Sequence, residues 1–533
     1  MEYRDLYNCF PLLCKLYHEN PELDITDFFQ NPFSVYESEV DNLNKRGNYG
    51  KYCALALCVM FNNWLDEEWM TDDIDKEKRT IIKNTCEACR LDRGTSRLLL
   101  LDELKSLEYT FVKKEQGVYK AIHDKVFDFL SSFFGQRMIQ CVIKNANSWI
   151  ISQRLLLHTQ DDMDQFITVV PPKYHHKYVQ RMVYDWEKQR VQHVFFNINM
   201  KIPECRERFL SYLNTLDISC QRQLALTCDF ENKDTVLLHC CYLSDIPLIN
   251  WCISHGVDVN QSNCKGVSPL IGSSFGSNTE VIEILLHNKA DINLCGDSGV
   301  SPLITACSSG NTEIVRILLD NKADIEHCMQ NGGFPLYVAC EKNHIDVVKI
   351  LLENKANINK CTPDGTTPLF SACQKNHIDV VKLLLDNKAD MNKCMLDEVH
   401  PLLIACQNNH IEVVKVLLKN NADINKCTKN GVSPLLSACQ QNHLELVNFL
   451  LENNADINKC TKDGVSPLFI ACQNNHIEIV HLLLDNMADF EKCTNFGLSP
   501  LFIAHIKNHK EIEQLLRGRI EYQSRKYIDE PLD

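Results

Sequence analysis

A single motif returns every 33 residues through the C-terminal half of the chain. It centres on a [T/S]-P-L turn, and proline follows the first position in eight of the nine copies. A strict period of this length predicts one supersecondary unit stacked on copies of itself. Such a stack offers an extended surface for binding rather than an enclosed pocket for catalysis. The first position of the motif is occupied by Thr235, Ser268, Ser301, Phe334, Thr367, His400, Ser433, Ser466 and Ser499.

The copy over residues 362–394 shows how one unit is expected to fold. Asp364-Gly365 is a turn signal, because glycine accepts positive φ at little steric cost. Thr367-Pro368 predicts the start of a helix, since the hydroxyl can cap free N–H groups and proline fits the first helical position. A second helix over 378–385 is apolar on most of its surface, so it must be buried between neighbouring units.

The layout [D/N]-G-x-[T/S]-P-L-x-x-A-[A/C]-x-x-x-H-x-[E/D]-[V/I]-V-x-[L/I]-L-L-x-x-x-A-[D/N] resembles the ankyrin repeat and covers residues 231–519. The resemblance implies a mostly α fold, an α-solenoid in which each copy is a finger-like turn plus two antiparallel helices. It also implies that the fingers and first helices line a concave face that binds another protein.

Some copies depart from the family pattern. The histidine that usually follows T-P-L is replaced, for example by Ile304. The glycine near the end of the second helix survives as Gly256 and becomes Lys322, Lys388 or Asn421 elsewhere. A lysine in left-handed geometry costs about 1–2 kcal/mol. The sixth copy has Glu398 at the turn glycine and His400 at the capping hydroxyl, which predicts a locally loosened finger.

Cysteine and histidine also recur in columns, which we interpret as packing. Stacked helices lie about 8–10 Å apart, too far for a disulfide and too far for histidines to converge on one zinc ion. We expect both cysteine columns to be buried thiols, and the histidines to hydrogen-bond across repeat junctions. The columns are Cys295, Cys328, Cys361, Cys394, Cys427, Cys460 and Cys493; Cys307, Cys340, Cys373, Cys406, Cys439 and Cys472; and His344, His377, His410, His443, His476 and His509.

The charge balance narrows the classes of partner. With 70 acidic and 55 basic residues the formal charge is −15, which argues against general binding to nucleic acid or anionic membrane. The N-terminus has no apolar signal core, and the longest apolar run, over 53–61, is about half a membrane span. We therefore expect a protein of the cytoplasm, with the nucleus as an alternative. We expect no enzyme activity, cofactor or metal; the C-x-x-C pair Cys86 and Cys89 has no matching second pair.

The first 230 residues show no period. Residues 109–119, YTFVKKEQGVY, predict a β-hairpin with Gly117 near its turn, and an amphipathic helix is expected over 121–134. Two strands followed by such a helix suggest a winged-helix arrangement. A winged helix can bind DNA, but this region is not strongly basic.

Residues 119–130, YKAIHDKVFDFL, are similar to the winged-helix stretch of NACHT-like STAND NTPases, and Phe10-Pro11-Leu12-Leu13 resembles a segment of their small helical domain. This resemblance covers about residues 5–160. It implies that His123 senses a nucleotide phosphate and that Pro11 packs on adenine. No G-x-x-x-x-G-K-[S/T] loop occurs in the sequence, so phosphoryl transfer has no site. Either the chain is the C-terminal part of a longer protein, or it is a paralogue that has lost the nucleotide-binding domain. In the chain as given, packing is the favoured role for His123.

The sequence thus predicts five segments. They are a helical remnant over 1–40, a winged-helix-like domain over 41–160, a helical adaptor that caps the first repeat over 161–230, nine repeats over 231–519 and a flexible tail over 520–533.

Contact residues for a protein partner are expected where the copies differ, on finger tips and at the ends of first helices. We interpret the chain as a non-enzymatic scaffold or recognition module. The alternative is the sensor and regulatory half of a STAND-type switch in innate immunity. The partner-binding positions expected are Asp297, Gln330, Glu341, Pro363, Gln374, Leu396, Gln407, Lys429, Gln440, Lys462, Gln473 and Phe496.

Overall fold

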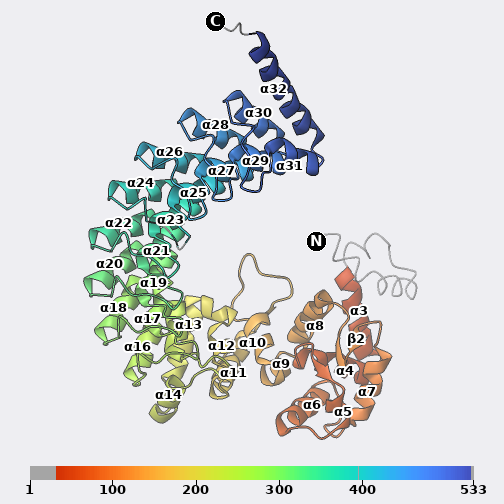
Figure 1. Ribbon diagram of the computed structural model, residues 1–533. Helices are drawn as coiled ribbons and strands as arrows, with labels where there is room; N and C mark the ends of the chain where they lie inside the picture. Colours follow the sequence, from red (N-terminus) through yellow and green to blue (C-terminus); the bar gives the residue numbers. More distant parts are fainter. Residues whose placement is uncertain (1–31, 394, 396, 530–533) are drawn as a thin grey trace. The chain divides into compact units, whose positions relative to one another are not determined.

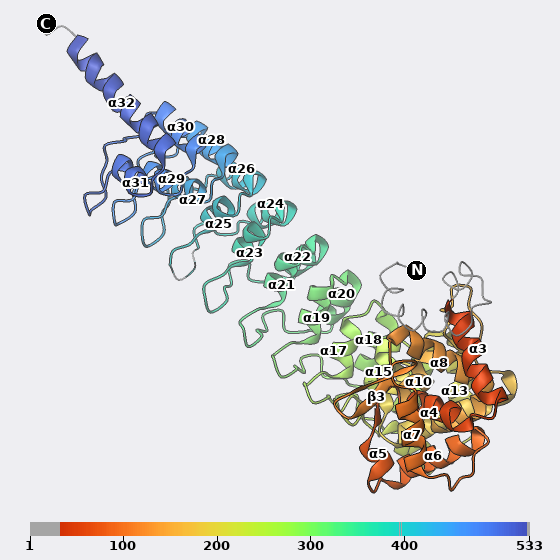
Figure 2. The same cartoon turned by 90° about the vertical axis from the view of Figure 1, so that its right-hand side faces the viewer.

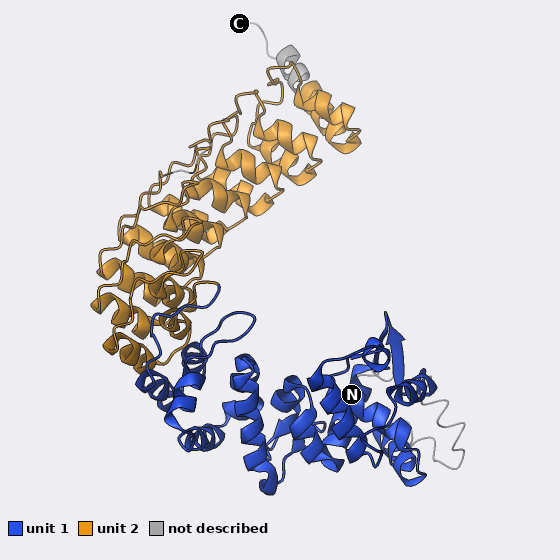
Figure 3. Ribbon diagram, turned by 90° about the horizontal axis from the view of Figure 1, so that it is seen from below, with its two compact units in different colours: residues 1–264 blue, residues 265–533 orange. Residues whose placement is uncertain are grey.

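The computed structural model describes residues 32–393, 395 and 397–529. It divides into two compact units, residues 1–264 and 265–533, shown in separate colours in Figure 3. The division falls one repeat after the predicted start of the repeats at 231. Pro11 and most of the predicted segment 1–40 lie outside the described residues, and helix α3, Pro32–Lys45, runs across its boundary.

Unit 1 is mainly helical. The apolar run over 53–61 forms most of helix α4, Tyr49–Met60, and its residues from Tyr52 to Met60 are buried. A helix that is apolar all round needs neighbours on every side, and α4 packs against α3, α6, α7 and α8. The other helices that the structure describes between residue 46 and the first repeat are α5 Glu68–Thr71, α6 Lys76–Ala88, α7 Arg97–Ser106, α8 Asp124–Arg137, α9 Ile139–Asn145, α10 Ser148–Arg154, α11 His175–Glu187, α12 Val191–Phe195, α13 Pro203–Leu213 and α14 Ile218–Ala225, with 3-10 turns η1 Pro172–Tyr174 and η2 Ile198–Lys201.

The predicted hairpin is confirmed as β2, Val112–Glu115, and β3, Val118–Ala121. Gln116 and Gly117 both have positive φ, the geometry that two-residue hairpin turns require. The predicted helix start at 121 is wrong. Ala121 pairs with Val112 at the end of the hairpin, and the helix begins only at Asp124, after the His123 ring caps its first turn.

A short strand, β1 Leu65–Asp66, pairs antiparallel with β3 and completes a sheet of order β1-β3-β2. A second, two-stranded sheet joins β4 Leu155–Leu156 and β5 Thr168–Val169 in parallel.

Unit 2 contains helix pairs in two layers, first helices on one side and second helices on the other, with the fingers projecting from the stack (Figures 1 and 2). Each first helix packs on its own second helix and on the first helix of the next copy. The pairs are α17 Pro269–Ser274 with α18 Thr279–His287, α19 Pro302–Ser309 with α20 Thr312–Asp320, α21 Pro335–Glu341 with α22 Ile345–Glu353, α23 Pro368–Gln374 with α24 Ile378–Asp386, α25 Pro401–Gln407 with α26 Ile411–Lys419, α27 Pro434–Gln440 with α28 Leu444–Glu452, α29 Pro467–Gln473 with α30 Ile477–Asp485, and α31 Pro500–Ile506 with α32 Lys510–Asp529.

The first copy lies in unit 1 as α15 Val236–Leu243 and α16 Ile246–Ser254. At the other end, α32 continues through Asp529 into the predicted flexible tail. Residues 520–529 contain neither glycine nor proline, and Pro531 is the first helix breaker after them. Within the described part of the chain, no helix combines the length and apolar character needed to cross a membrane.

Candidate protein-binding surface

The hydroxyl of the repeat motif caps the first helix in most copies. In the third copy, Ser301 Oγ accepts from Ile304 N–H at 3.2 Å, and Pro302 occupies the first helical position. The sixth copy keeps the cap with another group, because His400 Nδ1 accepts from Leu403 N–H at 3.3 Å. In the fourth copy Phe334 makes no side-chain cap. From the second copy on, each first helix nevertheless begins at the proline of the motif.

The histidine column is confirmed as a set of cross-repeat hydrogen bonds. His377 Nε2 lies 3.0 Å from the Glu341 carbonyl oxygen of the preceding copy, and His443 Nε2 lies 3.0 Å from the Gln407 oxygen. His476 and His509 use Nδ1 instead and bond the carbonyls of Cys439 and Cys472 at 2.9 Å. These bonds fix the end of each first helix, where partner-binding residues were predicted.

The two cysteine columns differ from each other. The column that includes Cys373 is fully buried as expected, and burial raises the pKa of its thiols. The expected burial of the other column is wrong: Cys328, Cys361 and Cys493 are exposed and Cys295 is half-buried. This column follows the second helix and enters the finger, where neighbouring copies leave the side chain open to solvent. Cys394 lies outside the described residues.

The replaced glycines after the second helices are in left-handed geometry. Lys322, Lys388 and Asn421 have φ of 67°, 65° and 65°, as the ankyrin-like pattern requires. Glu398, at the turn glycine of the sixth copy, also has positive φ, 60°. These residues thus adopt the left-handed backbone that the family builds with glycine, although their Cβ atoms make this conformation sterically unfavourable.

The fingers are joined by a ladder of backbone hydrogen bonds. Gln330 N donates to the Ser298 carbonyl of the preceding finger at 3.0 Å, and Lys462 N donates to the Asn430 carbonyl at 3.0 Å. Asp297 and Lys429 donate in the same way at 3.1 Å. Pro363 stands at the equivalent position and has no N–H. Asp297, Gln330, Lys429 and Lys462 are therefore held to the preceding finger by their backbones.

The structure places the predicted contact positions on the fingers and at the ends of first helices. Glu341 and Gln473 are half-buried, and Leu396 lies outside the described residues. Phe496 is 78% exposed but stands one position beyond the finger column, which is continued by Asn495. The exposed members are Asp297, Gln330, Pro363, Gln374, Gln407, Lys429, Gln440, Lys462 and Phe496.

We call these exposed residues the finger surface. The Gln330 side chain is engaged, since its amide donates to the Asp297 carbonyl. Among the described residues, the side chains of Lys429 and Lys462 have no ion pair, although both are exposed. Two unpaired cations on neighbouring fingers can attract an acidic group of a partner.

Two features of unit 2 were not predicted from the sequence. Lys393 and Lys426 donate through Nζ to the carbonyls of Asn359 and Asn392 in the preceding copy, the latter at 2.9 Å. The 33-residue recurrence of lysine could have indicated this second ladder. At the end of the stack Phe502 and Ile506 are 47% and 57% exposed, and Ile506 stands 33 residues after Gln473.

Of the two residues implicated by the N-terminal resemblance, Pro11 lies outside the described residues. His123 is half-buried, and its Nδ1 accepts from Lys125 N–H at 3.2 Å. This bond gives His123 a structural role as a helix cap.

Comparison with known proteins bears on the repeats. A family model described as ankyrin repeats (3 copies) matches five overlapping segments, 237–327, 273–362, 303–395, 369–460 and 435–526. Together they cover more than half of the chain. A crystal structure of the human ASB11 ankyrin repeat domain is 30% identical, with 41% of this chain and 98% of that chain covered and a TM-score of 0.38. No curated protein matches the chain.

Proposed function

The chain belongs to the ankyrin-repeat family, and we propose that it is a non-enzymatic recognition module whose finger surface binds a partner protein. One observation carries the proposal. The stack satisfies its backbone through finger and histidine hydrogen bonds, while the finger-surface side chains stay exposed and differ in type at the finger tips Asp297, Gln330, Pro363 and Lys429. Residues that the fold does not need are free to select a partner.

The partner that suits this surface carries an acidic patch. Lys429 and Lys462 supply unpaired positive charge on the seventh and eighth fingers. Gln407 and Gln440, at the ends of the adjacent first helices, supply amide donors and acceptors. Complementary charge raises the association rate and selects against other partners.

The test is a charge reversal on the finger surface. A partner is first identified by affinity capture on the full chain and mass spectrometry, and then purified. We expect Lys429→Glu/Lys462→Glu to weaken its binding at least tenfold, since each reversal replaces attraction by repulsion. Arg316→Glu/Lys419→Glu is the matched control, because both residues are exposed on second helices. Equal affinity of the two variants would exclude the finger surface.

A compartment with reduced thiols suits the module. The cysteines of the described residues are free thiols, the state that the cytosol and nucleus maintain. This supports the inference of a cytoplasmic protein, with the nucleus as the alternative. The absence of a nucleic-acid partner is inferred from the net charge of −15.

A second proposal is that the chain is the sensor and regulatory half of a STAND-type switch in innate immunity. It is supported by the hairpin β2–β3 followed by α8, with His123 at the junction. Mapping the start of the transcript and of translation tests it. An in-frame nucleotide-binding loop upstream would support the switch, and a translation start mapped to Met1 would contradict it.

A further inference from the structure

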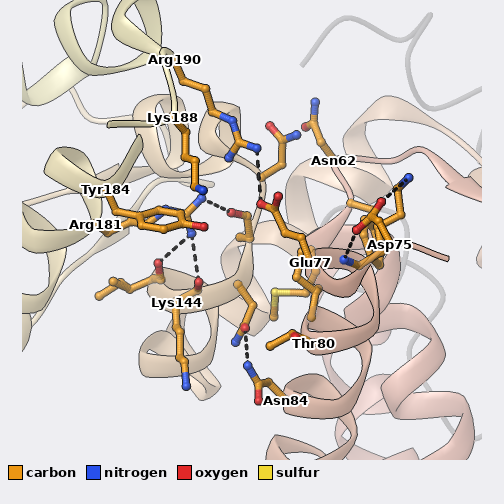
Figure 4. A pocket seen from close by; sticks show the side chains of 18 of the residues that line it. Asn62, Asp75, Glu77, Thr80, Asn84, Lys144, Arg181, Tyr184, Lys188 and Arg190 are labelled. Atoms are coloured by element: carbon orange, nitrogen blue, oxygen red, sulfur yellow. Dashed lines mark hydrogen bonds and ion pairs between the residues drawn. The ribbon is translucent and has the colours of Figure 1, made fainter. Parts of the chain in front are cut away.

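Unit 1 contains a large open groove outside the repeats. Its volume is about 1370 Å³, and it is lined by the end of α4, the first half of α6, the end of α9, and α11 with the turn after it. Figure 4 shows side chains from these elements around one space. A typical pocket for a small ligand measures about 300–1,000 Å³, so this groove can hold an elongated ligand.

The groove is strongly basic within an acidic chain. Seven lysines and arginines line it, against the two acidic residues Asp75 and Glu77. The chain as a whole carries a formal charge of −15. A concentration of one sign of charge in a concave site raises the local concentration of oppositely charged ligands. The groove therefore favours an anion.

Most of this positive charge is not neutralised. Lys78 pairs with Asp75 at 2.9 Å, and Arg181 pairs with Asp185 at 3.1 Å. Lys76, Lys144, Lys177 and Lys188 are exposed, and no ion pair joins any of them to another of the described residues. They come from three elements, α6, α9 and α11 with its cap. A ligand must carry several negative groups to reach more than one of them.

One side of the groove is lined by Arg181, which is 8% exposed. Its guanidinium donates to the carbonyls of Ile143 and Lys144 at 3.1 Å and to that of Ala146 at 2.8 Å. These are the carbonyls at the end of α9. Arg181 thereby holds the backbone that carries Lys144 before any ligand arrives, which reduces the ordering cost of binding.

One carboxylate already occupies an anion position. Glu77 on α6 pairs with Arg190 across the groove at 3.3 Å, and both side chains are partly exposed. Arg190 also lies 3.4 Å from Asp185. An exposed ion pair of this kind contributes little to stability, so a phosphate group can replace the Glu77 carboxylate at little cost.

We propose that this groove binds a small polyphosphorylated ligand, with its phosphates bound by Lys76, Lys144, Lys188 and Arg190. Two sources share this chemistry. Lys188 Nζ lies 5.5 Å from the ring centroid of Tyr184, which is 41% exposed and lines the groove. A nucleoside triphosphate that draws Lys188 onto its phosphates can also stack its base on this ring. A polyphosphate without a base uses the charges alone. This function is independent of partner binding by the repeats.

Calorimetric titration of the full chain with ATP and with inorganic tripolyphosphate tests the proposal. We expect Lys144→Gln/Lys188→Gln to weaken binding of both probes by about fivefold, as for two exposed charge contacts, and raised salt to weaken binding further. The control is Lys45→Gln/Lys201→Gln, which removes two exposed lysines, also at helix ends, outside the groove. This control should bind as the wild type does.

A gain of affinity provides a second readout that misfolding cannot imitate. Glu77→Gln removes the exposed carboxylate partner of Arg190, leaves its contact with Asp185, and should tighten binding about twofold or more. Equal affinity for the two probes assigns recognition to the phosphates, and tighter ATP binding that Tyr184→Ala removes assigns it to a nucleotide. The proposal is overturned if neither probe binds saturably, if the groove and control variants bind alike, or if hexaglutamate binds as tightly as tripolyphosphate.

Discussion

At the level of single residues, His400 caps the first helix of its copy in place of the usual Thr or Ser hydroxyl. The ring is 2% exposed, accepts from Leu403 N–H through Nδ1, and bonds the Lys426 carbonyl through Nε2 at 3.0 Å. A protonated ring has no acceptor and would lose the cap. Burial accordingly lowers the pKa of His400.

This geometry predicts loss of stability in acid. The unfolded ring titrates near pH 6.5 and the folded ring lower, so below about pH 6.5 the unfolded state takes up the proton first. The contribution of the neutral cap is present above that pH and lost as pH falls. We expect His400→Ser to keep the cap and to lose less stability than the wild type between about pH 7.5 and 5.5.

Urea unfolding followed by circular dichroism at both pH values measures the effect. Some pH dependence should persist in the variant, because burial also lowers the pKa of His239 and His193. An equal loss of stability in wild type and His400→Ser would show that His400 does not carry the effect.

Lys388 gives a second residue-level prediction. Its φ of 65° costs a lysine about 1–2 kcal/mol, whereas glycine accepts that geometry at an entropic cost of about 0.5–1 kcal/mol. Lys388→Gly should therefore raise the free energy of unfolding by about 0.5–1 kcal/mol in urea titration. Lys382→Gly, inside α24, should lower it by about 1 kcal/mol. A loss in both variants would contradict the account.

At the level of elements, the repeat was predictable because its signals are local and periodic. Thr367-Pro368 predicts a helix start, and the apolar run from Ile378 predicts a buried second helix; both are found. The hairpin was predictable from Gly117 and its flanking strand residues. The exposure of Cys361 was not, because a period shows that positions are equivalent and not which of them a neighbouring copy covers.

The same Cys→Ser substitution should affect stability to different extents in the two cysteine columns. Cys373→Ser places a hydroxyl in a fully buried site and should cost about 1–3 kcal/mol. Cys361→Ser, at an exposed site, should stay within about 0.5 kcal/mol. Alkylation of the native chain, read by mass spectrometry, should modify Cys361 and spare Cys373. Comparable labelling of Cys361 and Cys373 would contradict the burial of the column that includes Cys373.

At the level of the whole molecule, the two units differ in how far the sequence predicts them. Unit 2 is a stack in which each copy contacts its neighbours; its period together with the resemblance to the ankyrin repeat predicted its fold, and the resemblance suggested the proposed binding surface. Unit 1 has no period, and its groove is lined by residues between Met60 and Arg190 that lie far apart in the sequence. No local pattern marks Lys76, Lys144 and Lys188 as neighbours, so only the tertiary structure could find that site.

The central claim is that the finger surface of the repeats binds a partner protein. The most direct measurement is the dissociation constant of the purified partner for the full chain and for the two charge-reversal variants. We expect Lys429→Glu/Lys462→Glu to weaken binding at least about tenfold. Changing the partner's acidic contact to lysine should partly restore the binding of this variant. Arg316→Glu/Lys419→Glu should bind as the wild type does. Unchanged binding of the finger variant, with its circular dichroism also unchanged, would contradict the account.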